Sequence, residues 1–187
     1  MLALLSILLA AAVGAAEEAP TPEEIGSIRV YLTPEQARGR IFPKAEFHQQ
    51  AMVPIPRSGG NAPPIASFAA DSLQLYIAYA EEGKPLGYSV VLNEIGKYRP
   101  ISFMVGVTRD FRIKDVAVLV YRESRGGEVR RARFLRQYRG KRTSDPVRIN
   151  RDIINITGAT LSVRALNRGV RESVRLVKQL YGSAAHP

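Results

Sequence analysis

The chain has 187 residues and a formal net charge of +10, and its 45% hydrophobic and 24% charged residues are the balance of an ordinary globular domain. It contains no Cys, which excludes disulfides, iron–sulfur clusters and thiolate metal sites on protein ligands. Because its two histidines, His48 and His186, are far apart in the sequence, we expect no metal site. The basic excess suits nucleic acid, an anionic membrane surface or a phosphate-bearing ligand, and charge alone does not choose among them.

Residues 2–16 form an apolar segment that only Ser6 interrupts. It ends in the small residues Val13-Gly14-Ala15-Ala16 before Glu17, as a secretory signal peptide does before its cleavage site. No Lys or Arg precedes the segment, and it is short for a bilayer span, so an uncleaved membrane anchor and a buried core helix remain open alternatives. Export predicts a location in the periplasm or on the outer face of the cytoplasmic membrane.

The next elements can be predicted in chain order. Residues 17–26 are a flexible lead-in, and Thr33-Pro34-Glu35-Gln36 predicts a capping box that starts a short helix, which ends before Pro43. Residues 56–64 are rich in Pro, Gly and Asn and predict a loop. Strands are expected over residues 45–55, 73–80, 86–92, 101–108 and 113–121. Tight turns at 81–85 and 109–112 make two adjacent hairpins and therefore an antiparallel sheet.

The C-terminal third of the chain predicts helices. A short helical pattern covers residues 129–138, and one further short strand is expected over 147–156. From Ser162 onwards, apolar residues recur three or four positions apart, which predicts an amphipathic helix with one face on the sheet. These apolar residues are Val163, Leu166, Val170, Val174 and Val177. The predicted fold class is α+β, one antiparallel sheet with packed helices over residues 27–182, after the signal or anchor segment 1–16 and before a short tail, 183–187.

Residues 122–142 are strongly basic, with nine Lys or Arg and two Glu. A solvated basic face explains this stretch as well as phosphate, membrane or nucleic-acid binding does. Phe134 and Tyr138 lie four residues apart, so we expect them on the buried face of a helix and not stacked on bases. Catalytic motifs such as G-x-S-x-G, H-E-x-x-H and a Walker or dinucleotide fingerprint are absent from the sequence, which disfavours an autonomous enzyme.

The segment Thr157-Gly158-Ala159-Thr160-Leu161-Ser162 resembles the flavinylation motif of the FMN-binding domain family. That family includes the C subunit of the sodium-translocating NADH:quinone reductase and the G subunit of the Rnf complex. The resemblance extends over residues 83–180, including the turn 121–128, the segment 134–141 and the hairpin "EGKPLGYSVVLNEIGKYRPISFMVGV", and more weakly over 31–37. Two positions differ from the family pattern: Ile154 stands where an Asp is usual, with Asp152 the nearest acid, and Gly127 stands where a Leu is frequent.

The resemblance implies an FMN joined to Thr160 through a phosphoester, installed by a flavin transferase that takes the FMN from FAD. It implies that Thr157, Gly158, Ala159, Leu161 and Ser162 surround this cofactor, with Glu123 and Ser124 near the ring or ribityl chain. The implied function is that of an exported electron-transfer flavoprotein domain with membrane-associated redox partners and no nucleic acid. The alternative is a basic module that binds nucleic acid or anionic surfaces without flavin.

Elementary chemistry agrees with a phosphate at this place. Free N–H groups and the helix dipole favour anions at a helix start, where we expect Thr160. Thr157 and Ser162 offer hydroxyl donors, and Arg164 offers a positive charge. The competing interpretation is that Thr160 or Ser162 is only the N-cap of the helix.

Overall fold

The structure is a computed structural model and describes residues 28–54 and 72–182 of the chain. The predicted signal or anchor segment, the loop 56–64 and the tail lie outside these residues. The elements are β1 (Arg29–Val30), α2 (Pro34–Ile41), β2 (Phe47–Pro54), β3 (Ser72–Tyr79), β4 (Pro85–Ile95), β5 (Pro100–Thr108), β6 (Ile113–Tyr121), η1 (Gly127–Arg130), α3 (Ala132–Leu135), η2 (Arg136–Tyr138) and α4 (Thr160–Tyr181).

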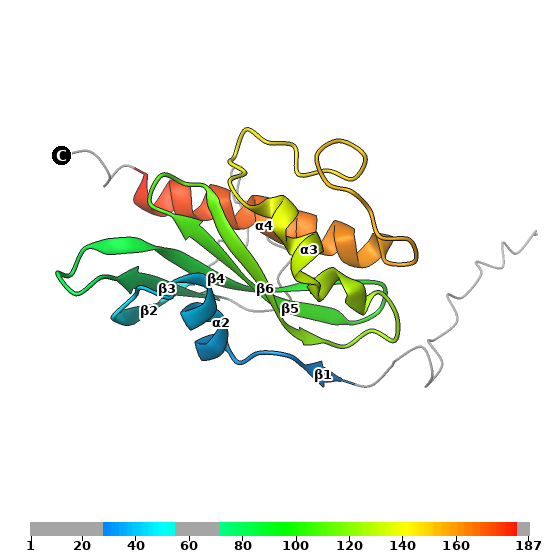
Figure 1. Cartoon of the computed structure of the whole chain (residues 1–187), viewed down its shortest axis with the longest axis horizontal. Coiled ribbons are helices and arrows are strands. Elements are labelled where there is room, and N and C mark those ends of the chain that lie inside the picture. The colour runs from blue at the N-terminus through cyan, green and yellow to red at the C-terminus, as the bar shows by residue number, and fades with distance from the viewer. Residues whose placement is uncertain (1–27, 55–71, 183–187) are drawn as a thin grey trace, which may run out of the picture.

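The strands form one antiparallel sheet in the order β1-β6-β5-β4-β3-β2. The long helix α4 packs on one face of this sheet, against β4, β5 and β6, and the short helix α2 packs on the opposite face (Figure 1). The α+β fold class predicted from the sequence is therefore confirmed. Among the helices of the described residues, none is both long enough and apolar enough to span a bilayer.

Side-chain alternation along β5 divides the core between the two helices. Phe103 and Val105 belong to the cluster under α4, whereas Met104 belongs to the smaller cluster under α2. The five predicted apolar positions of α4 are all buried, as expected. The helix lies very close to the sheet at Gly169, where an added Cβ would come within 2.4 Å of the Phe103 ring.

The start of α2 has the predicted capping box. The Thr33 hydroxyl accepts from the Gln36 N–H at 3.2 Å, and the Gln36 side chain accepts from the Thr33 N–H at 2.9 Å. The helix ends at Ile41, before Pro43, as predicted. Both orphan N–H groups are satisfied within the capping box, which explains a stable eight-residue helix at an edge of the fold.

Two predictions for the C-terminal third need correction. The strand expected over 147–156 does not form, and only an isolated bridge between Ile149 and Ile153 remains. Val147 and Asn150 adopt positive φ values of 43° and 62°, and the Asp152 carboxylate accepts the N–H groups of Val147 and Arg148, so the segment closes into a turn. The helical pattern over 129–138 is present but broken into η1, α3 and η2.

Candidate functional site

The sheet topology brings three separate segments to one end of the molecule. β4 and β6 both pair antiparallel with β5, so they run in the same direction, and Ile95 and Tyr121 end them at the same side of the sheet. The turn 97–99 and the segment 122–126 leave from this side. The start of α4 joins them through a hydrogen bond of 2.8 Å between the Tyr121 and Ser162 hydroxyls.

These segments enclose a cavity of about 540 Å³, here called the Thr160 cavity, which has the size of a small-ligand site. Its lining residues are Lys97, Tyr98, Glu123, Ser124, Arg125, Gly158, Ala159, Thr160, Leu161 and Ser162. Seven residues predicted to contact a cofactor thus come together in one cavity, although they derive from two distant segments of the chain. Thr157 is the predicted residue that does not line this cavity.

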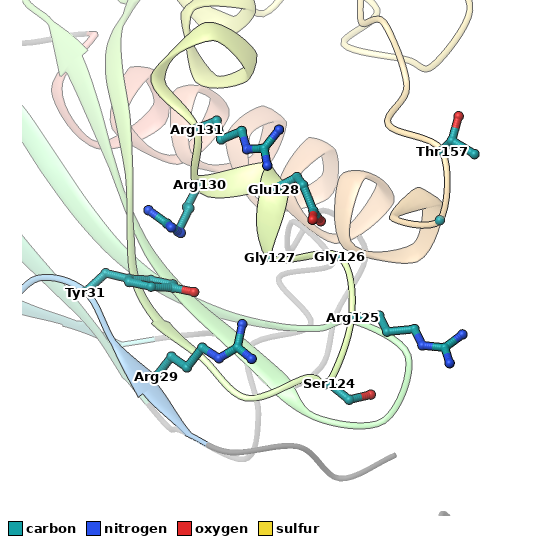
Figure 2. A pocket seen from close by; sticks show the side chains of 11 residues that line it. Arg29, Tyr31, Ser124, Arg125, Gly126, Gly127, Glu128, Arg130, Arg131 and Thr157 are labelled. Carbon is teal, nitrogen blue, oxygen red and sulfur yellow. The ribbon is translucent and has the colours of Figure 1, made fainter. Parts of the chain in front are cut away.

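Thr157 lies instead in an adjoining cavity of about 400 Å³, here called the Tyr31 cavity, which shares Ser124, Arg125 and Gly158 with the first. Figure 2 shows Arg29 and Tyr31 on one side of this cavity, Arg130, Arg131 and Glu128 on another, and Thr157 across from them. The Arg130 guanidinium stacks over the Tyr31 ring, 4.6 Å from its centroid. The rim is therefore mainly positive, because the described residues that line it include four arginines and one acidic residue, Glu128.

Thr160 is the first residue of α4, and its hydroxyl is partly buried. Ala159 occupies the N-cap position and provides no side-chain hydrogen bond, so neither Thr160 nor Ser162 is the cap of this helix. The amide of Asn155 donates to the Thr160 hydroxyl at 2.9 Å and orients it. A helix start without a side-chain cap leaves N–H donors that suit an anion.

Ser162 lines the Thr160 cavity and also has a structural contact. The residue is 5% exposed, and its hydroxyl bonds to the Tyr121 phenol, which donates to the Arg125 carbonyl. Burial is the main cause that raises the pKa of Tyr121 to about 12, so this phenol stays protonated at neutral pH. Gly126 closes the same wall with φ 84°, and an added Cβ would lie 2.7 Å from the Tyr121 hydroxyl. Ser162 thus shapes the wall behind Thr160.

Glu123 also has a defined structural task. It is 4% exposed, and its Oε1 accepts the backbone N–H groups of Lys97, Tyr98 and Arg99 at 2.6, 2.7 and 2.9 Å. One carboxylate oxygen therefore holds the turn 97–99 in place, and this turn forms part of the wall of the Thr160 cavity. Ser124 makes no such bond to any residue within 28–54 or 72–182, and it lies where the two cavities meet.

Sequence reasoning missed four residues of the site: Lys97, Tyr98, Arg125 and Asn155. The Lys97 ammonium lies 4.4 Å from the centroid of the Tyr98 ring, on the wall of the cavity. The signal for these two was the Gly96–Pro100 turn between two strands, which antiparallel topology places at the same end as residues 122–126. For Asn155 the sequence pattern holds no comparable signal.

Three neighbours of the motif are also placed by the structure. Ile154, at the family's acidic position, is 77% exposed. The Asp152 carboxylate is instead bound to the Lys141 ammonium at 2.9 Å and to two backbone N–H groups. Arg164, which we expected beside the phosphate, lines a separate recess with Arg148 and does not line the Thr160 cavity.

A comparison with known families agrees with this geometry. The family model of the FMN-binding domain matches residues 96–175, which include both walls of the Thr160 cavity. These residues belong to the FMN-binding domain family. FMN is accordingly the cofactor of the domain. No curated protein matches the chain.

Two solved structures are similar to this chain. The crystal structure of Shewanella oneidensis NqrC is 18% identical in sequence, with 78% of this chain and 86% of that chain covered and a TM-score of 0.54. The NqrC-type component of the Na⁺-translocating NADH-quinone reductase from Parabacteroides distasonis is 15% identical, with 84% and 86% covered and a TM-score of 0.49. Because the Shewanella oneidensis NqrC sequence is 18% identical, its similarity to this chain shows a shared fold alone.

The residues present fit the phosphate end of FMN. Gly158 has φ 79° and open space where a side chain would stand, so the approach to Thr160 is free. The uncapped start of α4 supplies N–H donors beside it. The Asn155 Oδ1 atom is buried without a partner among the described residues, so it is free to accept a hydrogen bond from a bound group.

Proposed function

We propose that this chain is an exported electron-transfer protein that holds FMN in the Thr160 cavity, attached covalently to the Thr160 hydroxyl. The observation that carries the proposal is the convergence of the 97–99 turn, residues 123–125 and the start of α4 on one cavity within the matched residues. Bound there, FMN supplies the redox chemistry, and the protein sets its position and its electrostatic surroundings.

Attachment is a phosphoryl transfer from FAD, for which a separate flavin transferase is required. The Thr160 oxygen forms the new bond to the phosphorus that carries the riboflavin. The bond between that phosphorus and the oxygen that joins the two phosphates of FAD breaks, AMP leaves, and the hydroxyl proton is lost to a base. Asn155 holds the Thr160 oxygen in one orientation, so less orientational freedom has to be lost before the oxygen reacts.

The chain's own residues divide the remaining tasks. The N–H groups at the start of α4 bind the phosphate, and Tyr98 and Leu161 offer apolar surface to the flavin. Arg125, shared by the two cavities, and Arg29 on the rim of the Tyr31 cavity favour negative charge on a reduced cofactor. The same positive rim suits membrane-associated redox partners with acidic contact surfaces.

The rival function, nucleic-acid binding by residues 122–142, has less support. Arg122 donates to the Pro100 carbonyl and Ser102 hydroxyl, and Arg139 and Lys141 pair with Asp115 and Asp152. Phe134 and Tyr138 are 6% and 0% exposed, so they offer no stacking surface for bases. Binding should therefore be weak, independent of nucleotide sequence and steeply dependent on salt.

The test is to express the full chain with and without an active flavin transferase. Intact mass, peptide mapping and in-gel fluorescence after denaturation should locate one FMN on Thr160 only when the transferase is present. N-terminal sequencing and fractionation of the same culture should find the protein outside the cytoplasm. A colourless protein from cells with active transferase contradicts FMN binding, whereas a native yellow protein that loses its colour on denaturation contradicts only the covalent link.

A further inference from the structure

A recess of about 360 Å³, here called the arginine recess, lies between α4 and the loop before it, apart from the Thr160 cavity. In Figure 1 that loop, coloured yellow to orange, runs alongside α4. The residues that line the recess are Val147, Arg148, Ile149, Arg164, Asn167, Arg168 and Arg171. Four of these seven are arginines and none is acidic, so the recess concentrates positive charge.

Two of the arginines are held in place by the protein. Arg168 donates from Nε to Glu94 Oε2 and from Nη2 to the Ile95 carbonyl, both at 3.0 Å. Arg171 donates from Nη1 to the Val147 carbonyl at 2.9 Å and so joins the loop to α4. A guanidinium carries five N–H donors, so each of these arginines keeps donors for a further acceptor.

The other two arginines have no counter-charge among the described residues. In the part of the chain that the structure describes, the guanidiniums of Arg148 and Arg164 make no hydrogen bond and no ion pair, and both residues are exposed. Burial is the main cause that lowers the pKa of Arg171. The charge of Glu172 opposes this shift, and the charges of Arg175, Arg148 and Arg168 act in the same direction as burial. An anion among these groups would relieve their mutual repulsion.

Asn167 adds a buried donor to the wall of the recess. It is 4% exposed, and its Oδ1 accepts a hydrogen bond of 2.8 Å from the Tyr138 phenol. With the amide in this orientation, its NH₂ group makes no hydrogen bond among the described residues. An amide N–H donor beside four guanidiniums suits an anion.

We propose that the arginine recess binds a phosphate group carried by a small alcohol, from either a lipid head group or a soluble phosphate ester. Guanidiniums match phosphate oxygens with paired N–H donors, and the recess has room for a phosphate with an attached glycerol. The site does not depend on the flavin, because Thr160 does not line it.

Two binding measurements separate the sources of the phosphate. Calorimetry with sn-glycerol 3-phosphate tests the soluble ester, and co-sedimentation with phosphatidylglycerol–phosphatidylcholine vesicles, against phosphatidylcholine alone, tests the lipid. The recess variant is the full chain with both R148Q and R164Q. A matched control carries R133Q and R136Q, which remove the same charge from exposed positions outside the recess.

The recess variant should weaken binding at least about tenfold and the control less than about twofold, since only the first removes donors from the site. Binding to vesicles alone assigns the lipid head group, and binding of glycerol phosphate assigns the soluble ester. The Thr160→Val variant should bind like the wild type. Equal losses in both double variants, absence of saturable binding in both measurements, or loss of binding in Thr160→Val overturns the proposal.

Discussion

The amide of Asn155 donates a hydrogen bond to the hydroxyl of Thr160, with 2.9 Å between Nδ2 and Oγ1. This bond occupies one lone pair of the hydroxyl and leaves its proton free, so the oxygen has one fixed orientation at the mouth of the Thr160 cavity. Both residues come from the loop-to-helix junction, which is why the relationship depends on the turn 157–158 between them.

Asn155→Ala should slow covalent flavin attachment by up to about tenfold without abolishing it, because one neutral hydrogen bond contributes about 0.5–1.5 kcal/mol. The rate is measured as the mass increase over time with purified transferase and FAD. Thr157→Val is the control, since Thr157 is exposed and lies in the adjoining cavity. An unchanged rate in Asn155→Ala shows that the bond does not position the nucleophile.

Thr160→Val should lose covalent flavin completely and keep the fold, because valine retains the branched shape but has no oxygen for a phosphoester. Thr160→Ser keeps an oxygen and should retain partial attachment. Intact mass and peptide mapping decide the result, with circular dichroism as the check on folding. Flavin that remains attached in Thr160→Val would place the linkage on another residue.

Glu123→Gln should destabilise the fold by about 1.5–3 kcal/mol, since the carboxylate that receives three N–H groups becomes a neutral amide. The same change should weaken FMN binding, because the freed turn carries Lys97 and Tyr98 to the cavity wall. Urea unfolding and flavin titration measure the two effects. Glu128→Gln is the matched control, and equal losses in both variants would contradict the role of Glu123.

The sequence predicts most of the sheet and α4 because their burial follows simple periods. The alternation in β5 and the spacing of Val163, Leu166 and Val170 are visible without a structure. The turn at 147–153 is not visible, since its apolar residues favour a strand. The positive φ of Val147 is held by the hydrogen bond from its N–H to Asp152 and by the bond from Arg171 to its carbonyl. Thr160 is visible from its motif, whereas Lys97 reaches the site only through strand register.

Tyr121 makes stability depend on pH in the alkaline range. Its pKa is about 12 in the folded state and about 10 when unfolded, so its contribution is complete below pH 10 and is lost between pH 10 and 12. The loss amounts to at most about 3 kcal/mol. Tyr121→Phe should show a shallower fall of unfolding free energy in that range, measured by urea titration at each pH. Parallel curves for wild type and variant would contradict this assignment.

Ile154 stands where an Asp is usual in the family. A substitution at this position tests recognition by the flavin transferase separately from the stability of the fold. Ile154 is 77% exposed, so Ile154→Asp should change the free energy of unfolding by no more than about 0.5 kcal/mol. It restores the acid that the family has at this position, and it should therefore speed attachment of flavin by the transferase.

Asp152→Asn is the matched change at the nearest acid. The Asp152 carboxylate binds Lys141 and the N–H groups of Val147 and Arg148, so its loss should cost about 1–3 kcal/mol of stability. Burial opposes ionisation, but the Arg148 and Lys141 hydrogen bonds hold the pKa of Asp152 below its ordinary value. This stabilisation is present above the unfolded pKa and is lost as the pH falls through the folded one. Attachment rates and urea unfolding are measured on both variants. If Asp152→Asn slows attachment under conditions in which the variant is still fully folded, and Ile154→Asp leaves the rate unchanged, the transferase recognises Asp152.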